Sequence, residues 1–147
     1  VFQILDRGDL LHFSLEPEPG IRVSPSFGDI PLKDNLIYKA AELLKKESKH
    51  SDSLPGVHIR VEKNLPMGGG LGGGSSNAAS TLLALNYLWE INLDEDSLAT
   101  IGANLGADVP IFVRGKSAWA EGIGEIITPI QLSEFWYVIL VHLIYPF

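Results

Sequence analysis

The segment from Pro66 to Ser76 is rich in glycine, which occupies six of the seven positions from Gly68 to Gly74. Glycine costs about 0.5–1 kcal/mol relative to alanine inside regular structure, so such a run is favoured where side chains would block a close approach. A polar Ser-Ser-Asn sequence follows, and then an apolar stretch up to Trp89. A glycine loop that opens a helix turns free N–H groups and the positive end of the helix dipole toward one point. The pattern predicts a phosphate-binding loop.

Other interpretations of these glycines fit less well. A flexible linker is usually followed by polar residues, whereas this run is followed by an apolar one. Gly68, Gly70 and Gly73 satisfy the dinucleotide pattern G-x-G-x-x-G, but the acids about twenty residues later, Asp94 and Glu95, open a predicted helix instead of ending a strand. A Walker A loop needs a lysine before its Ser or Thr, and no lysine lies between positions 63 and 116.

Two kinds of side chain near these glycines could take part in phosphoryl transfer. Ser75, Ser76 and Asn77 fit the first turn of the helix, where they can cap it or bind a phosphate oxygen or its magnesium ion. Asp108 follows a helix stop at Gly106. Phosphoryl transfer needs an acceptor for the proton of the attacking hydroxyl, and otherwise mainly positioning and charge stabilisation. Asp108 is therefore a candidate base, and a turn or helix-capping aspartate is the alternative.

Three motifs occur in a fixed order along the chain. They are the loop from Leu65 to Ala79, the segment Gly106-Ala107-Asp108-Val109-Pro110 and the segment Ala120-Glu121-Gly122-Ile123-Gly124-Glu125. Together they resemble the GHMP kinase superfamily, which includes galactokinase, homoserine kinase and mevalonate kinase. Their fine form is similar to the branch that phosphorylates the 2-hydroxyl of a diphosphocytidyl methylerythritol in non-mevalonate isoprenoid (terpenoid) biosynthesis.

The resemblance implies a transferase that uses ATP and Mg²⁺ on a small-molecule alcohol. It implies that Asp108 is the catalytic base, that Asn35 and Lys63 lie near the adenosine, and that Ser76 contacts the magnesium ion. The residues that it places around the triphosphate are Pro66, Met67, Gly68, Gly69, Gly70, Leu71, Gly72, Gly73, Gly74, Ser75 and Ser76. The alternatives are a non-catalytic nucleotide-binding fragment and a GHMP kinase that acts on another small alcohol.

Strands and helices mix irregularly along the chain, which predicts an α+β fold. The resemblance implies the N-terminal domain of GHMP kinases, a fold also described as ribosomal protein S5 domain 2-like. The predicted strands are Phe2–Leu5 and Leu10–Leu15, forming a hairpin, then Ile21–Val23, Val57–Val61, Lys116–Glu121, Glu125–Ile130 and a buried strand Trp136–Val141. The predicted helices cover about 35–48, capped by Asp34, about 75–89, and about 95–104, capped by Asp94.

The amino-acid composition of the chain disfavours some classes of binding partner. The chain has 11 basic and 18 acidic residues without a long lysine or arginine run, which disfavours binding to nucleic acid or to an anionic membrane. Without cysteines, neither disulfides nor thiolate metal sites can form. The first fifteen residues are too charged for a signal or membrane segment, and a cytoplasmic location fits. The expected partners are a small-molecule substrate and, at most, a second copy of the chain.

The resemblance also describes the extent of the chain. Residues 1–147 look like a GHMP kinase N-terminal ATP-binding domain that is incomplete at both ends. The family's upstream Pro-x-Lys segment, its Tyr-His pair and its C-terminal domain with a second glycine-rich motif are not among these residues. We therefore expect residues 1–147 alone to be inactive.

Overall fold

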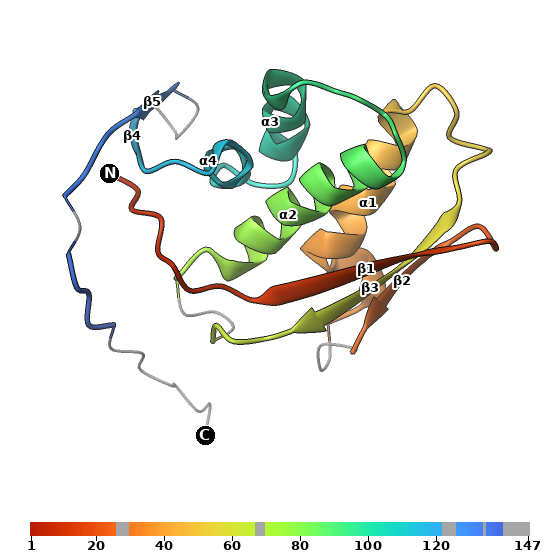
Figure 1. The fold of residues 1–147 in the computed structure, drawn as a ribbon, viewed down its shortest axis with the longest axis horizontal. Coiled ribbons are helices and arrows are strands. Elements are labelled where there is room, and N and C mark those ends of the chain that lie inside the picture. The colour runs from red at the N-terminus through yellow and green to blue at the C-terminus, as the bar shows by residue number, and fades with distance from the viewer. Residues whose placement is uncertain (26–29, 67–69, 122–125, 134, 140–147) are drawn as a thin grey trace.

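The structure is a computed structural model, and it describes residues 1–25, 30–66, 70–121, 126–133 and 135–139. A three-stranded sheet forms one side of the described part, and helices are layered on one face of that sheet (Figure 1). A separate two-stranded sheet lies near the N-terminus. This mixture confirms the predicted α+β fold.

The larger sheet has β3 (Gly56–Glu62) at its centre, between β1 (Leu10–Glu16) and β2 (Ile21–Ser24). Strand β1 runs antiparallel to β3 and β2 runs parallel to it. Along β3 the side chains of Val57, Ile59 and Val61 are buried, because alternate residues of a strand face the same side. Strand β3 ends at Glu62, and the chain then enters the glycine loop.

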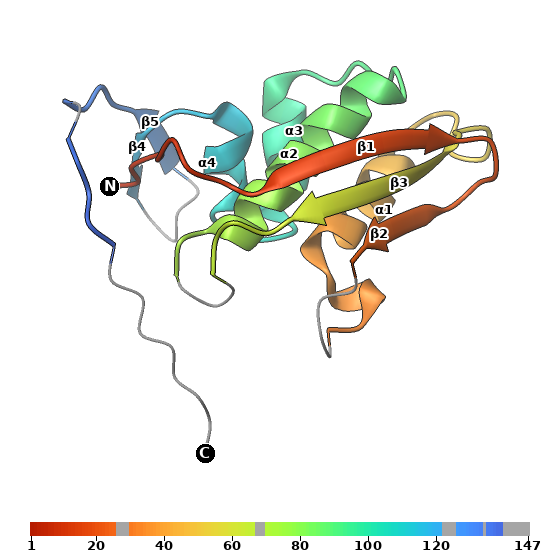
Figure 2. The same ribbon diagram turned by 60° about the horizontal axis from the view of Figure 1, so that its bottom comes forward.

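Two helices pack on the sheet and on each other. They are α1 (Leu36–Glu47) and α2 (Gly73–Leu88), with α1 next to β2 and α2 next to β1. On the other side of α2 lie α3 (Glu95–Ala103) and α4 (Val109–Arg114), as the turned view shows (Figure 2). Leu82 and Leu85 are fully buried, which confirms that α2 is central, although Leu83 and Tyr87 are exposed.

Several predicted boundaries are confirmed. The side chain of Asp94 accepts a hydrogen bond from the N–H of Ser97 at 2.8 Å and so caps α3, as predicted. Strands β4 (Ala118–Glu121) and β5 (Ile126–Pro129) pair antiparallel, as expected for the two strands predicted there. The predicted turn at residues 122–124, and Glu125, lie outside the described residues.

The N-terminal hairpin was predicted wrongly. Strand β1 pairs along its whole length with β3, and Phe2 instead forms an isolated bridge with Ala118. Alternation of apolar and polar residues shows that a segment is a strand but does not identify its partner. Pairing with β3 places the start of β1 beside the glycine loop.

Three further predictions need correction. Asp34 does not cap α1, because Leu32–Asp34 forms a short 3₁₀ turn and Asn35 accepts the hydrogen bond from the Ile37 N–H at 2.8 Å. Helix α4 was not predicted at all. Residues 136–139 of the predicted buried strand form no strand, and Trp136 is fully exposed; positions 140 and 141 lie outside the described residues. Across the described ranges, no helix is long and apolar enough to span a membrane.

Candidate functional site

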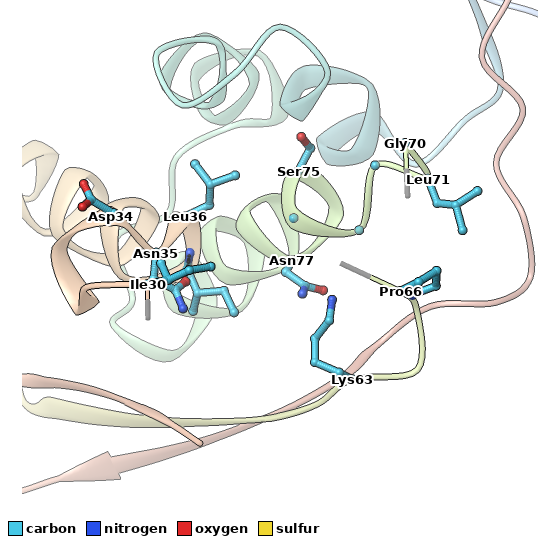
Figure 3. A pocket seen from close by; sticks show the side chains of 14 residues that line it. Ile30, Asp34, Asn35, Leu36, Lys63, Pro66, Gly70, Leu71, Ser75 and Asn77 are labelled. Atoms are coloured by element: carbon cyan, nitrogen blue, oxygen red, sulfur yellow. Dashed lines mark hydrogen bonds between the residues drawn. The ribbon is translucent and has the colours of Figure 1, made fainter. Parts of the chain in front are cut away.

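A cavity of about 350 Å³ opens where the start of α1, the end of β3 and the N-terminus of α2 meet (Figure 3). The lining residues that the sequence had nominated are Asn35, Lys63, Pro66, Gly70, Leu71, Gly72, Gly73, Gly74 and Ser75. They come from the start of α1 and from the segment between positions 63 and 75, which are well separated in the sequence. The structure therefore brings most of the described candidates to one place.

Five further residues were nominated from the sequence. Met67, Gly68 and Gly69 lie outside the described residues. Ser76 follows the lining residue Ser75 along α2 but does not itself line the cavity. Asp108 lies at the start of α4, which packs against α2.

The N-terminus of α2 is built to present backbone donors to the cavity. Gly72 occupies the N-cap position in a left-handed conformation, with φ at 69°, and its carbonyl accepts the first helical bond from Ser76 N at 2.8 Å. The N–H groups of Gly73, Gly74 and Ser75 precede that bond, so no acceptor within the helix is available to them. All three residues line the cavity. The arrangement suits an anion, which the helix dipole also favours.

Gly72 is further constrained by a helix that the sequence did not reveal. A Cβ atom added to Gly72 would lie 2.7 Å from Cζ of Phe112, on α4. Glycine is therefore favoured here, because any other residue would strain the left-handed backbone and would require the Phe112 ring to move. The contact also joins the turn before α2 to the helix that begins after Asp108.

Lys63 supplies the positive side chain of the cavity. Its side chain is about one-quarter exposed, at 24%, and its ammonium group donates to the carboxylate of Asp9. Figure 3 shows Lys63 and Asn77 pointing toward one another below the start of α2, whereas the Ser75 side chain lies on the other side of that turn. The lysine places a positive group beside the free backbone N–H groups, and the Asp9 carboxylate balances its charge.

Asp9 is the residue of this region that sequence reasoning missed. Burial alone would raise the pKa of its carboxyl, but hydrogen bonds from Lys63, the Leu65 N–H, Asn77 and the Asn64 N–H lower that pKa to about 2. In the sequence, Asp9 lies in the polar segment between the predicted strands Phe2–Leu5 and Leu10–Leu15. No local pattern distinguishes it, because its partners lie more than fifty residues away along the chain.

Asn35 has two roles to reconcile. It lines the cavity, as expected of a residue near a nucleotide, but its side-chain oxygen already caps α1. The amide nitrogen is then the atom that could donate to a ligand. A purely structural role as helix cap explains the asparagine equally well.

Asp108 has the backbone geometry of a residue that starts a helix. It occupies the N-cap position of α4 with φ −85° and ψ −17°, yet its side chain accepts no capping hydrogen bond. This observation weakens the interpretation of Asp108 as a helix cap. The carboxylate, which is partly exposed, is not used to hold the helix.

The described residues include no group of three or more His, Asp or Glu side chains that could hold a metal ion. Mg²⁺ bound with nucleotide phosphates needs few protein ligands, because phosphate oxygens and waters supply most of its coordination. In the first turn of α2, Ser75 lines the cavity and Ser76 does not. Ser75 is therefore the described hydroxyl residue that fits best beside a magnesium ion that arrives with its phosphates.

The chain belongs to the GHMP kinase family, since the family described as "GHMP kinases N terminal domain" matches residues 35–116. Two of the curated relatives that it resembles share one name. It is 57% identical over 141 residues to 4-diphosphocytidyl-2-C-methyl-D-erythritol kinase of Marinobacter nauticus, covering 95% of this chain and 48% of that protein. It is 51% identical to the Pseudomonas aeruginosa kinase of the same name, covering 96% and 49%. The chain thus spans about half the length of these relatives.

Solved structures give the same result for the fold. A crystal structure of 4-(cytidine 5'-diphospho)-2C-methyl-D-erythritol kinase matches with a TM-score of 0.71 and 38% identity, over 85% of this chain and 42% of that one. Homoserine kinase from Cytophaga hutchinsonii matches with a TM-score of 0.59 and 18% identity, over 79% and 36%. The second match is informative about the fold alone.

Proposed function

We propose that the protein phosphorylates the 2-hydroxyl of 4-diphosphocytidyl-2-C-methyl-D-erythritol with ATP, in non-mevalonate isoprenoid biosynthesis. The observation that carries the proposal is the cavity at the N-terminus of α2, where three backbone N–H groups and Lys63 surround a space that suits an anion. Family membership supports the use of ATP, because these relatives are kinases.

In this proposal the loop and α2 hold the triphosphate. The N–H groups of Gly73, Gly74 and Ser75 donate to phosphate oxygens, and the dipole of α2 favours the negative charge. Lys63 lies near the nucleotide, and the amide nitrogen of Asn35 reaches toward the adenosine. Ser76 would contact a bound Mg²⁺ ion, which would neutralise part of the charge on the phosphates. The remaining loop residues, Pro66 to Leu71, complete the wrapping of the phosphates.

Asp108 is proposed as the catalytic base. A base must accept the proton of the substrate hydroxyl as it attacks the γ-phosphate. The Asp108 carboxylate is suited to this role because it is partly exposed and is not used as a helix cap. The contact between Phe112 and Gly72 ties the helix that follows Asp108 to the phosphate loop.

The choice of alcohol rests on similarity. The chain is 50% to 57% identical to six curated relatives that share one kinase name, and only 18% identical to the homoserine kinase structure. Another alcohol acceptor is therefore the less supported alternative. A non-catalytic nucleotide-binding role is the other alternative.

Residues 1–147 are proposed to form the N-terminal ATP-binding domain, and this segment alone is expected to lack turnover. It spans about half of its relatives, and Trp136 and Val138 expose apolar side chains. The proposal places the reaction in the cytoplasm, with a small-molecule substrate and, at most, a second copy of the chain as partners.

The test is an ADP-release assay on the protein as its gene encodes it, with ATP and Mg²⁺. We expect turnover with diphosphocytidyl methylerythritol and none above background with homoserine or mevalonate. Turnover with one of the other alcohols would identify a different kinase. Binding of ATP without turnover on any of the three would favour the non-catalytic role.

A further inference from the structure

One buried carboxylate, that of Asp9, joins the two ends of the glycine loop. Its side chain is fully buried, with 0% exposure, immediately before β1. Four groups donate to it: the N–H of Asn64, the N–H of Leu65, the Lys63 ammonium and the Asn77 amide. A buried charge is stable only where such donors compensate it.

One carboxylate oxygen holds the beginning of the loop. Oδ1 accepts from the N–H of Asn64 at 2.8 Å and from the N–H of Leu65 at 2.9 Å. The Asn64 amide also donates to the carbonyl of Gly8 at 3.0 Å. The backbone just before Pro66 is thereby fixed to the start of β1.

The other oxygen holds the end of the loop and the cation of the cavity. Oδ2 accepts from Nδ2 of Asn77, in the first turns of α2, at 2.8 Å, and from Nζ of Lys63. Asn77 is buried, at 6% exposure, and both donors line the cavity. A single side chain therefore spans the segments on either side of the phosphate loop.

The placement of Asp9 also explains how a negative residue can lie next to an anion site. Its charge is matched by Lys63 and by three further donors, so it is not directed at the cavity. The same contact restrains the Lys63 side chain, which otherwise has considerable rotational freedom. Restraining it before a ligand arrives lowers the entropic cost of binding.

We propose that Asp9 is a positioning residue of the nucleotide site, which holds the two ends of the phosphate loop together and keeps the Lys63 ammonium at the cavity. This inference rests on the proposed function, because it concerns the affinity of that site for ATP. Asp9 touches neither nucleotide nor substrate in this account. It acts through Lys63, Asn77 and the backbone at positions 64 and 65.

The first variant is Asp9→Asn, which keeps the shape but replaces one acceptor by a donor. One amide oxygen can still accept from the N–H groups of Asn64 and Leu65. The amide NH₂ would then face Lys63 and Asn77, which are also donors. The matched control is Asp6→Asn, since Asp6 is an exposed carboxylate three residues earlier.

The experiment measures the dissociation constant of ATP by calorimetry for the protein as its gene encodes it. We expect Asp9→Asn to raise this constant about tenfold or more, as for the loss of charge-assisted hydrogen bonds, and Asp6→Asn to leave it unchanged. Lys63→Ala is then introduced into the parent protein and into the Asp9→Asn variant. This tests whether Asp9 acts through Lys63, because the effects of two residues that act through one contact are not additive. Asp9→Asn should weaken binding much less once Lys63 is removed.

Two results would overturn the inference and leave the proposed function intact. One is a folded Asp9→Asn protein that binds ATP as tightly as the parent does. The other is a double variant in which the effects of Asp9→Asn and Lys63→Ala on the dissociation constant of ATP multiply fully. If the parent protein does not bind ATP, the proposed function fails, and the inference fails with it.

A milder variant covers the case in which Asp9→Asn does not fold. Asn77→Ala removes one of the four donors, and Asp9 is the link from Asn77 to the backbone at positions 64 and 65. We expect faster amide hydrogen exchange at Asn64 and Leu65 in this variant. Unchanged exchange at both positions would contradict the role of Asp9 as the connection.

Discussion

Two carboxylates near the start of α2 and of α4, those of Asp9 and Asp108, differ in their surroundings and in the roles that we propose for them. The Asp9 carboxylate is buried and fully engaged by donors, whereas that of Asp108 is partly exposed and caps no helix. Burial with complete compensation is typical of a structural or positioning role. The partly exposed Asp108 carboxylate is the one that we propose as the proton acceptor.

The role of Asp108 predicts a separation between binding and turnover. Asp108→Asn should lower the rate of phosphoryl transfer by about 10²–10⁴, the range typical for loss of a general base. The dissociation constant of ATP should stay within about threefold of the parent value, because the loop is intact. Steady-state kinetics and calorimetry measure the two effects, with exposed Asp52→Asn as control. Unchanged turnover with a lower melting temperature would make Asp108 a turn residue.

The lowered pKa of Asp9 predicts how stability depends on pH. Because its pKa in the folded state is about 2, below the value of about 3.9 in an unfolded chain, ionised Asp9 stabilises the fold above pH 4. That contribution, about 2 kcal/mol, is lost as the pH falls from 4 toward 2. Urea unfolding at pH 5 and at pH 2.5 should show this loss in the parent protein and a smaller one in Asp9→Asn. Equal pH dependence in both proteins would show that Asp9 is not the responsible group.

At the scale of elements, the turn that starts α2 depends on a helix distant in the sequence. Gly72→Ala introduces a left-handed alanine and a clash with Phe112, so both stability and the shape of the loop should suffer. Gly115→Ala is the matched control, because Gly115 is also left-handed, with φ at 61°, but no atom lies within 4 Å of its added Cβ.

We expect both alanine variants to lose about 1–2 kcal/mol of stability from backbone strain, and Gly72→Ala to lose more. ATP affinity should fall about tenfold or more in Gly72→Ala and stay at the parent value in Gly115→Ala. Calorimetric titration of the two folded variants measures this difference. Equal affinities would mean that the geometry at Gly72 does not shape the site.

The elements also show what the sequence could predict. Helices α1 and α3, and strands β1, β2 and β3, follow from the local pattern of apolar and polar residues, and α2 follows from the long apolar segment after the glycines. The pairing of β1 with β3 does not, because a strand's partner depends on contacts about fifty residues apart. Helix α4 was missed because it is only six residues long and begins with Val-Pro, which also suits a turn.

Part of the candidate site could also be predicted from the sequence, and part of it could not. The glycines, Lys63 and Asn35 could be nominated because a loop motif and the family resemblance identify them, and all the described ones line the cavity. The network of Asp9 could not, since it joins four positions through side-chain contacts across the fold. The contact of Phe112 with Gly72 escaped prediction for the same physical reason.

At the scale of the whole molecule, two hollows compete for an anionic ligand. One is the cavity at the N-terminus of α2. The other, of about 420 Å³, is lined by three lysines, by the acidic residue Glu42 and by four further residues; the lining is Lys33, Lys39, Lys46, Glu42, Tyr38, Leu43, Asn104 and Leu105. Surface lysines attract anions generally, whereas fixed backbone donors at a helix N-terminus define a position for a phosphate. We therefore place the nucleotide in the cavity at the N-terminus of α2.

The most direct test of this assignment is a map of backbone-amide chemical shifts while a non-hydrolysable ATP analogue is added to the isotope-labelled protein as its gene encodes it. The account predicts the largest changes at Gly73, Gly74 and Ser75, with a change at Lys63. Changes centred instead on Lys39, Lys46 and Leu105, with the first turn of α2 unaffected, would contradict it.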